Sequence, residues 1–68
     1  MPVKIKKLKS ELSKAGFYSR SAKGSHTRWY YQHDPSIFVT LSGNDGNDAK
    51  PYQVKEVLDA LKRAKEIK

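Results

Sequence analysis

Apolar residues near the N-terminus recur at the spacing of one helix face. Four of them are separated by 3, 4 and 3 positions, with lysines and polar side chains between them: Ile5, Leu8, Leu12 and Ala15. This spacing lines one side of an α-helix. Gly16 follows, and glycine is favoured just after a helix C-terminus because it adopts a left-handed backbone without strain. The pattern predicts an amphipathic helix that ends at Gly16.

Between residues 17 and 42 the pattern changes to short runs rich in aromatic, β-branched and hydroxyl side chains. Such runs, bounded by turn residues, are typical of β-strands. We predict three strands, over residues 17–22, 26–33 and 37–42. The first turn is predicted at Lys23-Gly24-Ser25 and the second at Asp34-Pro35-Ser36. Residues 43–48, Gly-Asn-Asp-Gly-Asn-Asp, predict a polar loop.

A second helical pattern occupies the C-terminal part of the chain. Pro51 suits a first helical turn, where its missing N–H costs nothing, and Asp48 or Lys50 would lie near the cap. Apolar residues then recur at helical spacing: Val54, Val57, Leu58, Leu61 and Ala64. The predicted order is therefore α-β-β-β-α.

Alternation along the second predicted strand assigns its two faces. Trp29 and Tyr31 point one way and are predicted to pack beneath the two helices, whereas Arg28 and Tyr30 point the other way with His26. The prediction is an α+β fold, with a three-stranded antiparallel sheet and two helices on one of its faces. Residues 1–68 are predicted to form a single domain.

The charge is strongly positive and unevenly placed. The chain has 14 Lys and Arg against 7 Asp and Glu, a formal net charge of +7. Residues 1–28 contain eight of the basic residues and one acidic residue, Glu11. A basic excess on one part of a small protein is typical of a polyanion binder, so nucleic acid is the expected ligand. An acidic protein would use the same surface.

Several classes of site and location are not supported by the sequence. The chain has no cysteine, so it has no disulfide and no thiolate metal site. His26 and His33 are separated by roughly 23 Å along an extended strand, and the acidic loop lacks the closing glutamate of a calcium loop. We therefore predict no metal and no cofactor. No signal peptide or membrane span is recognised, which favours a cytoplasmic protein without membrane contact.

His26, next to the basic turn Lys23-Gly24-Ser25, is the candidate for chemistry, because histidine changes charge near physiological pH. RNA cleavage by internal attack needs a base for the 2′-OH, positive charge at the phosphate and an acid for the leaving oxygen. His26 would be the base. Positive charge would come from Lys23 and Arg28, and backbone amides from Gly24 and Ser25. The acid is left open among Lys50, Tyr52 and water.

The chain resembles the HicA-type toxins, the RNA-cleaving members of bacterial toxin–antitoxin pairs. The matching segments are Lys14-Ala15-Gly16-Phe17, Lys23-Gly24-Ser25-His26, Trp29-Tyr30, His33-Asp34-Pro35 and Phe38-Val39-Thr40-Leu41-Ser42-Gly43. The resemblance covers nearly the whole chain, and residues 48–53 are similar to one branch of the family. It implies a double-stranded-RNA-binding-domain-like fold and ribonuclease activity on mRNA with His26 as the catalytic residue. It also implies inhibition by a HicB-type antitoxin that covers this histidine. RNA contacts are expected at Lys23, Gly24, Ser25, Arg28 and Lys50.

Two other functions fit the same sequence. The first is a non-catalytic module that recognises duplex RNA by its shape, through lysines on the helices and loops. The second is a small inhibitor or adaptor that acts by protein contact alone, with no salt-dependent RNA affinity. The role of His26 separates these functions from that of an enzyme.

Overall fold

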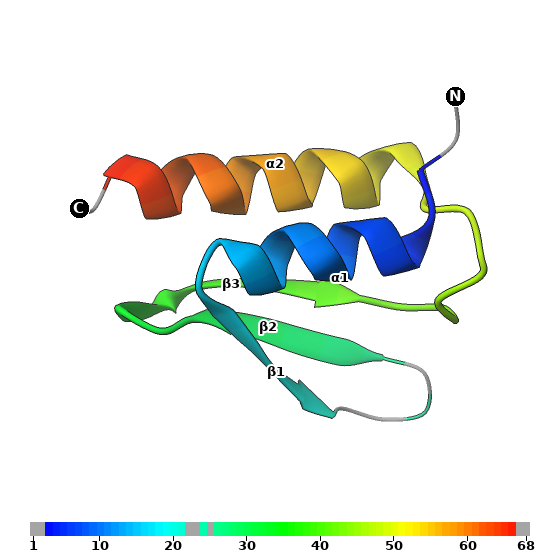
Figure 1. The fold of residues 1–68 in the computed structure, drawn as a ribbon, viewed down its shortest axis with the longest axis horizontal. Helices are drawn as coiled ribbons and strands as arrows, with labels where there is room; N and C mark the ends of the chain where they lie inside the picture. The colour runs from blue at the N-terminus through cyan, green and yellow to red at the C-terminus, as the bar shows by residue number, and fades with distance from the viewer. Residues whose placement is uncertain (1–2, 22–23, 25, 67–68) are drawn as a thin grey trace.

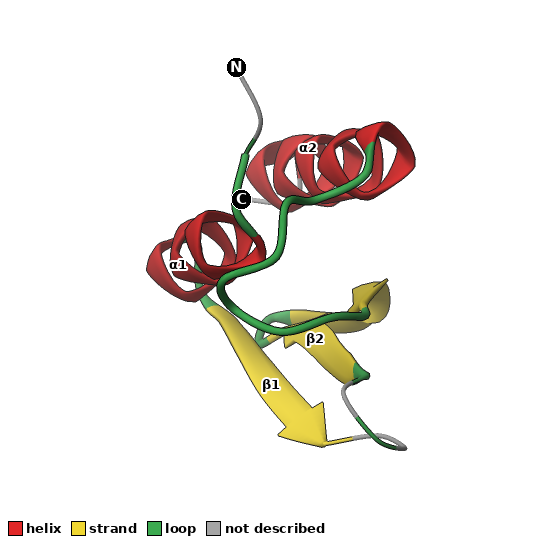
Figure 2. Cartoon of the chain, turned by 90° about the vertical axis from the view of Figure 1, so that its right-hand side faces the viewer, coloured by secondary structure: helices red, strands yellow, loops and turns green. Residues whose placement is uncertain are grey.

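A computed structural model describes residues 3–21, 24 and 26–66. The elements in chain order are α1 (Ile5–Lys14), β1 (Phe17–Ser21), β2 (Thr27–Tyr31), β3 (Asp34–Leu41) and α2 (Pro51–Glu66). The strands form an antiparallel sheet in the order β1-β2-β3. Both helices lie on one face of this sheet and leave the other face uncovered (Figures 1 and 2). The predicted α+β fold and its α-β-β-β-α order are confirmed.

The N-terminus of α1 obtains its hydrogen bonds from the polar loop after β3. The Ile5 N–H donates to the Asn47 carbonyl at 2.9 Å, and the Lys6 N–H donates to the Asp45 carbonyl at 3.1 Å. The first N–H groups of a helix have no partner within the helix, and Lys4 at the N-cap makes no side-chain cap. The loop therefore stabilises the start of α1 and is itself held against it.

The C-terminus of α1 ends as the sequence predicts, with one difference. Gly16 has a φ of 97°, the left-handed conformation that glycine adopts most readily. Its carbonyl accepts a hydrogen bond from the Gln32 N–H at 3.1 Å, which joins this turn to the end of β2. Ala15, predicted as the last residue of the apolar stripe, is exposed because it lies at the C-cap, where the helical repeat has ended.

The turn between β2 and β3 lies at residues 32–33, so the prediction of a turn at 34–36 is wrong. Asp34 already pairs with Tyr31, and the register then shifts between Tyr30 and Tyr31. The Asp34 carboxylate accepts hydrogen bonds from the Ser36 hydroxyl at 2.7 Å and the Ser36 N–H at 3.0 Å, and these bonds lower the pKa of Asp34. The local turn chemistry is therefore present, but it shapes the irregular start of β3.

The core lies between the sheet and the helices, and it contains the predicted Trp29 and Tyr31. The fully buried large side chains are Ile5, Leu12, Leu41 and Val57. On α2 the buried residues are Gln53, Val57, Ala60 and Ala64, and Leu58, one of the apolar residues at helical spacing, is 60% exposed. The buried residues are spaced by 4, 3 and 4 positions. Leu58 lies about 100° around the helix from Val57, on the side away from Ala60, so it falls outside this stripe.

Candidate functional site

His26 lines an open recess of about 390 Å³ on the molecular surface. Three parts of the chain meet there: α1, the ends of β1 and β2, and the loop after β3. The lining residues are Lys9, Ser21, Gly24, His26, Thr27, Gly43, Asn44 and Asp45. The recess therefore combines an imidazole with an ammonium, a carboxylate and two hydroxyl groups from segments far apart in the sequence.

The β1–β2 pairing places His26 at the edge of this recess. The last pair in this ladder is Ser21 with Thr27, and His26 immediately precedes Thr27. The His26 side chain is exposed. The imidazole therefore lies at the end of the β1–β2 ladder and is accessible to a large substrate.

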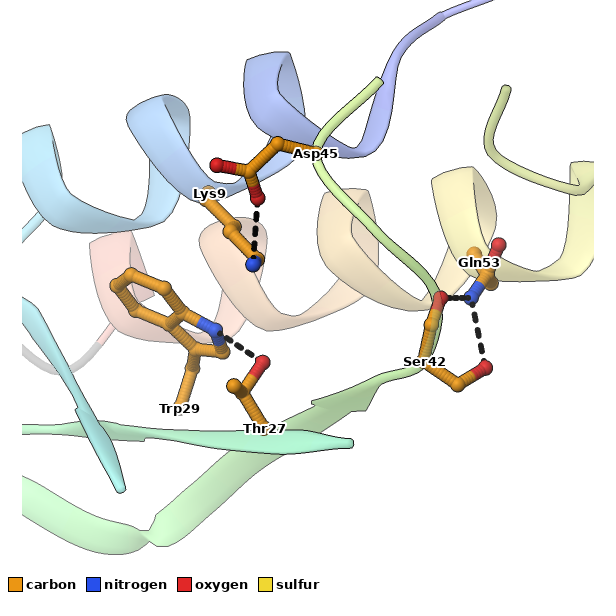
Figure 3. A network of polar contacts seen from close by, with 6 residues as sticks. All are labelled: Lys9, Thr27, Trp29, Ser42, Asp45 and Gln53. Carbon is orange, nitrogen blue, oxygen red and sulfur yellow. Dashed lines mark hydrogen bonds and ion pairs between the residues drawn. The ribbon is translucent and has the colours of Figure 1, made fainter. Parts of the chain in front are cut away.

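Thr27 is anchored from the core beneath the recess. The indole N–H of Trp29 donates a hydrogen bond to the Thr27 hydroxyl at 3.1 Å (Figure 3). Trp29 is 8% exposed, so packing fixes the donor. A buried indole N–H needs an acceptor. The Trp29–Thr27 bond therefore satisfies the core tryptophan and orients the residue next to His26.

Lys9 provides a cation in the recess that the sequence analysis did not single out for chemistry. Its ammonium forms an ion pair with the Asp45 carboxylate at 2.7 Å (Figure 3). The Lys9 side chain is 24% exposed, whereas the Asp45 side chain is 59% exposed. Lys9 directly follows the core residue Leu8 on α1, so its aliphatic stem covers the edge of the core and its charged end reaches the surface. In the sequence, the only indication of this role was the position of Lys9 beside the apolar stripe of the predicted helix.

The predicted site residues are not all found in the recess. Gly24 lines it, with a φ of 62° that disfavours other residues, and no atom of the described residues lies within 4 Å of where a Cβ would be. Arg28 is exposed and pairs with Arg20 and Thr40 in the sheet, outside the set of lining residues. Lys50 is also outside this set. Lys23 and Ser25 lie outside the residues that the structure describes.

Lys50 lies immediately before α2, where its backbone takes part in capping the helix. Its N–H donates a hydrogen bond to the Gln53 side-chain oxygen at 2.8 Å, one half of a capping box. The Gln53 amide nitrogen donates to the Ser42 carbonyl at 3.1 Å and to the Ser42 hydroxyl at 3.3 Å (Figure 3). The buried Gln53 therefore joins α2 to the end of β3. Lys50 lies near the cap of α2, as the sequence predicts.

A larger groove, of about 600 Å³, lies between the C-terminal parts of the two helices. Its ionisable side chains are Glu11, Lys14, Tyr31, Lys62 and Lys65. None of these is an imidazole, the side chain that ordinarily changes charge near physiological pH. The smaller recess, which contains the imidazole, is the better candidate site.

Within the described ranges, no three His, Cys, Asp or Glu side chains gather in a group that could hold a metal ion. The helices among these residues are also too short or too polar to cross a membrane.

A comparison with protein families decides the assignment. The model of the HicA toxin of bacterial toxin–antitoxin systems matches residues 5–65. The chain belongs to the HicA toxin family. This match spans nearly the whole chain and includes every residue that lines the recess. Searches of curated proteins and of solved structures gave no significant match. The resemblance to HicA toxins is confirmed, and the protein is a toxin of a toxin–antitoxin system with an antitoxin as its partner.

Proposed function

We propose that this HicA toxin is a metal-independent endoribonuclease of the cytoplasm that cleaves mRNA, with His26 as the catalytic residue. The observation that supports this most strongly is the exposed His26 imidazole in one recess with the Lys9 ammonium. The net charge of +7 favours association with RNA. A HicB-type antitoxin would neutralise the toxin by covering the recess and so excluding RNA.

The proposed reaction is an internal transfer at phosphorus. His26 accepts the proton of a ribose 2′-OH, and that oxygen attacks the adjacent phosphorus. The bond from phosphorus to the 5′-oxygen of the next nucleotide breaks, and this oxygen takes up a proton from an acid, for which Lys50, Tyr52 and water are the candidates. The products are a 2′,3′-cyclic phosphate and a 5′-hydroxyl, so no water or metal is consumed in the cleavage step.

Lys9 would stabilise the negative charge that accumulates on the phosphate. A cation that is already held in position costs little reorganisation during the reaction. The Asp45 carboxylate keeps the Lys9 ammonium at the recess while leaving it further hydrogen-bond donors for a phosphate oxygen. Gly24 permits close approach of the RNA backbone, and Lys23 and Arg28 would hold phosphates on either side.

Purified protein is expected to cleave an mRNA in the presence of EDTA. The expected fragments have a 2′,3′-cyclic or 2′-phosphate at one end and a 5′-hydroxyl at the other, because the 2′-oxygen is the nucleophile. Enzymatic labelling of the new 5′ ends and mass spectrometry of the 3′ ends measure this. A 2′-deoxy substitution at the cleaved nucleotide is the matched control and should block cleavage. Cleavage that requires a divalent cation, or that leaves 5′-phosphates, would contradict the mechanism.

Substituting Lys9→Met should lower kcat/KM for RNA cleavage by about tenfold to a hundredfold, since it removes the preorganised charge at the phosphate. Kinetics on a short RNA measure this. Lys6→Met is the matched control, because Lys6 is an exposed lysine of the same helix that does not line the recess. Asp45→Asn keeps the Lys9 ammonium but removes the carboxylate that holds it, so it should lose less activity than Lys9→Met. Equal losses of kcat/KM for Lys9→Met and Asp45→Asn would contradict this role and show that the ion pair only stabilises the fold.

A further inference from the structure

The helices leave one face of the sheet uncovered (Figure 2). An aromatic row crosses this face, because its residues alternate along the strands with the buried residues of the core. Tyr18, Tyr30 and Phe38 come from the three strands and occupy paired positions in the register. The ring centroids are 5.7 Å apart for Tyr18 and Tyr30, and 5.9 Å apart for Tyr30 and Phe38. Tyr18 is 44% exposed and Phe38 is 53% exposed. A surface row of rings is therefore available to a ligand.

The next row of the same face is basic. Arg20 of β1 pairs with Arg28 of β2, which in turn pairs with Thr40 of β3, and both arginines are exposed. Like charges directly opposite each other in a sheet are destabilising. An anion between the two guanidinium groups would relieve this repulsion. The row therefore indicates a ligand that carries negative charge as well as flat apolar surface.

We propose that this uncovered sheet face, with its aromatic and arginine rows, is a binding platform for single-stranded RNA. Unpaired bases would stack on Tyr18, Tyr30 and Phe38, and phosphates would contact the arginines. Stacking on exposed rings accepts any base, whereas the bases of a duplex are already stacked on one another. The inference deepens the proposed function, on which it rests, by naming unpaired RNA as the substrate class.

The platform leads directly to the proposed catalytic residue. Tyr30 and Arg28 are followed towards the N-terminus of β2 by His26, at intervals of two residues. Four residues of extended chain separate Tyr30 from His26, a distance of roughly 13 Å. A strand of RNA held on the rings and arginines would therefore reach the end of β2 and turn around it into the recess, which Lys9 lines from the side of the helices. This arrangement positions an unpaired segment for cleavage.

The test measures RNA affinity of the full chain carrying His26→Ala, which removes the proposed base. Fluorescence anisotropy with a short unpaired oligoribonucleotide compares this parent with the additional substitutions Tyr18→Ser and Phe38→Ser. Their combination should weaken binding by about tenfold or more, because each lost ring removes a stacking contact. Leu58→Ser is the control, since Leu58 is a large apolar residue that is 60% exposed but lies on α2. It should leave affinity unchanged, and the unfolding midpoint of each variant should confirm that it is folded.

A second pair of variants tests the basic row without removing aromatic packing. Arg20→Gln and Arg28→Gln should each reduce the slope of log affinity against log salt by about 0.7, as expected for one lost phosphate contact to a single strand. A platform for unpaired RNA also predicts that the serine variants change affinity for a perfect duplex much less than for the single strand.

Two results would overturn the proposal. One is a folded double serine variant with the affinity of its parent for unpaired RNA. The other is a variant that keeps RNA affinity but loses binding to the antitoxin, which would make the face a protein interface. Failure of the nuclease proposal is distinguishable: RNA would then bind the platform, but the chain with His26 intact would not cleave it.

Discussion

Replacing His26 by alanine is expected to abolish both growth arrest and mRNA loss when the protein is expressed in a heterologous bacterium. Loss of a general base typically lowers a rate by about a hundredfold to ten-thousandfold. His26 is exposed and precedes β2, so its truncation leaves the sheet ladder and core in place. Growth curves and the integrity of a reporter mRNA, followed together at equal protein level, measure the effect.

His33→Ala is the matched control for this experiment. His33 is the second histidine of the chain, and it is also exposed. It lies in the turn after β2, at the opposite end of the strand from His26, where its ring packs edge-on against Tyr31 at 5.3 Å. The variant should keep the full growth arrest. This comparison separates the chemistry of His26 from a general effect of removing an imidazole.

Three outcomes would contradict a catalytic His26. If the intact chain and the His26→Ala variant arrest growth equally while the mRNA stays intact, the toxin acts without this imidazole. Binding of duplex RNA or contact with another protein would then be the better account. If the intact chain binds RNA with strong salt dependence but leaves it uncleaved, the non-catalytic RNA-binding module is favoured. Preserved arrest in His26→Ala with complete mRNA loss would place the catalytic group elsewhere.

The second large effect is expected for Leu12→Ala in α1. Leu12 has 0% of its surface exposed, and large-to-small substitutions at such positions cost about 2–5 kcal/mol through lost burial and a residual cavity. A domain of this length has a free energy of unfolding of roughly 3–10 kcal/mol. The substitution should therefore remove a large part of the stability. Urea unfolding followed by tryptophan fluorescence measures this, because the single Trp29 lies in the same core.

Leu58→Ala is the control for the core. It makes the same chemical change on α2, but Leu58 is 60% exposed. Its free energy of unfolding should change by less than about 0.5 kcal/mol. A loss comparable with that of Leu12→Ala would mean that Leu58 packs against a partner in solution. The pair of variants therefore also tests which face of α2 is buried.

The order of elements was predictable because each element has its own local signal. The apolar spacing of α1, the glycine after it and the proline at the start of α2 act within a few residues. Alternation in β2 likewise assigned Trp29 and Tyr31 to the core, because a strand with one covered face must place its large apolar side chains there. The sequence also singled out His26, through its position beside a glycine-containing basic turn, and its catalytic role stays a prediction.

The composition of the recess was decided by tertiary structure. Lys9 and Asp45 are 36 residues apart, and only the folding of the polar loop back onto α1 joins them. The same loop, predicted as a polar connection, provides the missing N-terminal hydrogen bonds of the helix. Neither contact has a local sequence signal, because charge and hydrogen-bonding capacity are similar in many exposed residues.

The sequence by itself therefore determined the elements, their order, much of the core and the candidate histidine. Tertiary structure decided that Leu58 is exposed while Gln53 is buried, and that His26 shares its recess with Lys9. It also aligned three surface rings from separate strands into one row. The physical reason is the range of the interactions in sequence. Periodicity and turn chemistry depend on residues that are neighbours in the chain, whereas a site depends on the register and packing of distant segments.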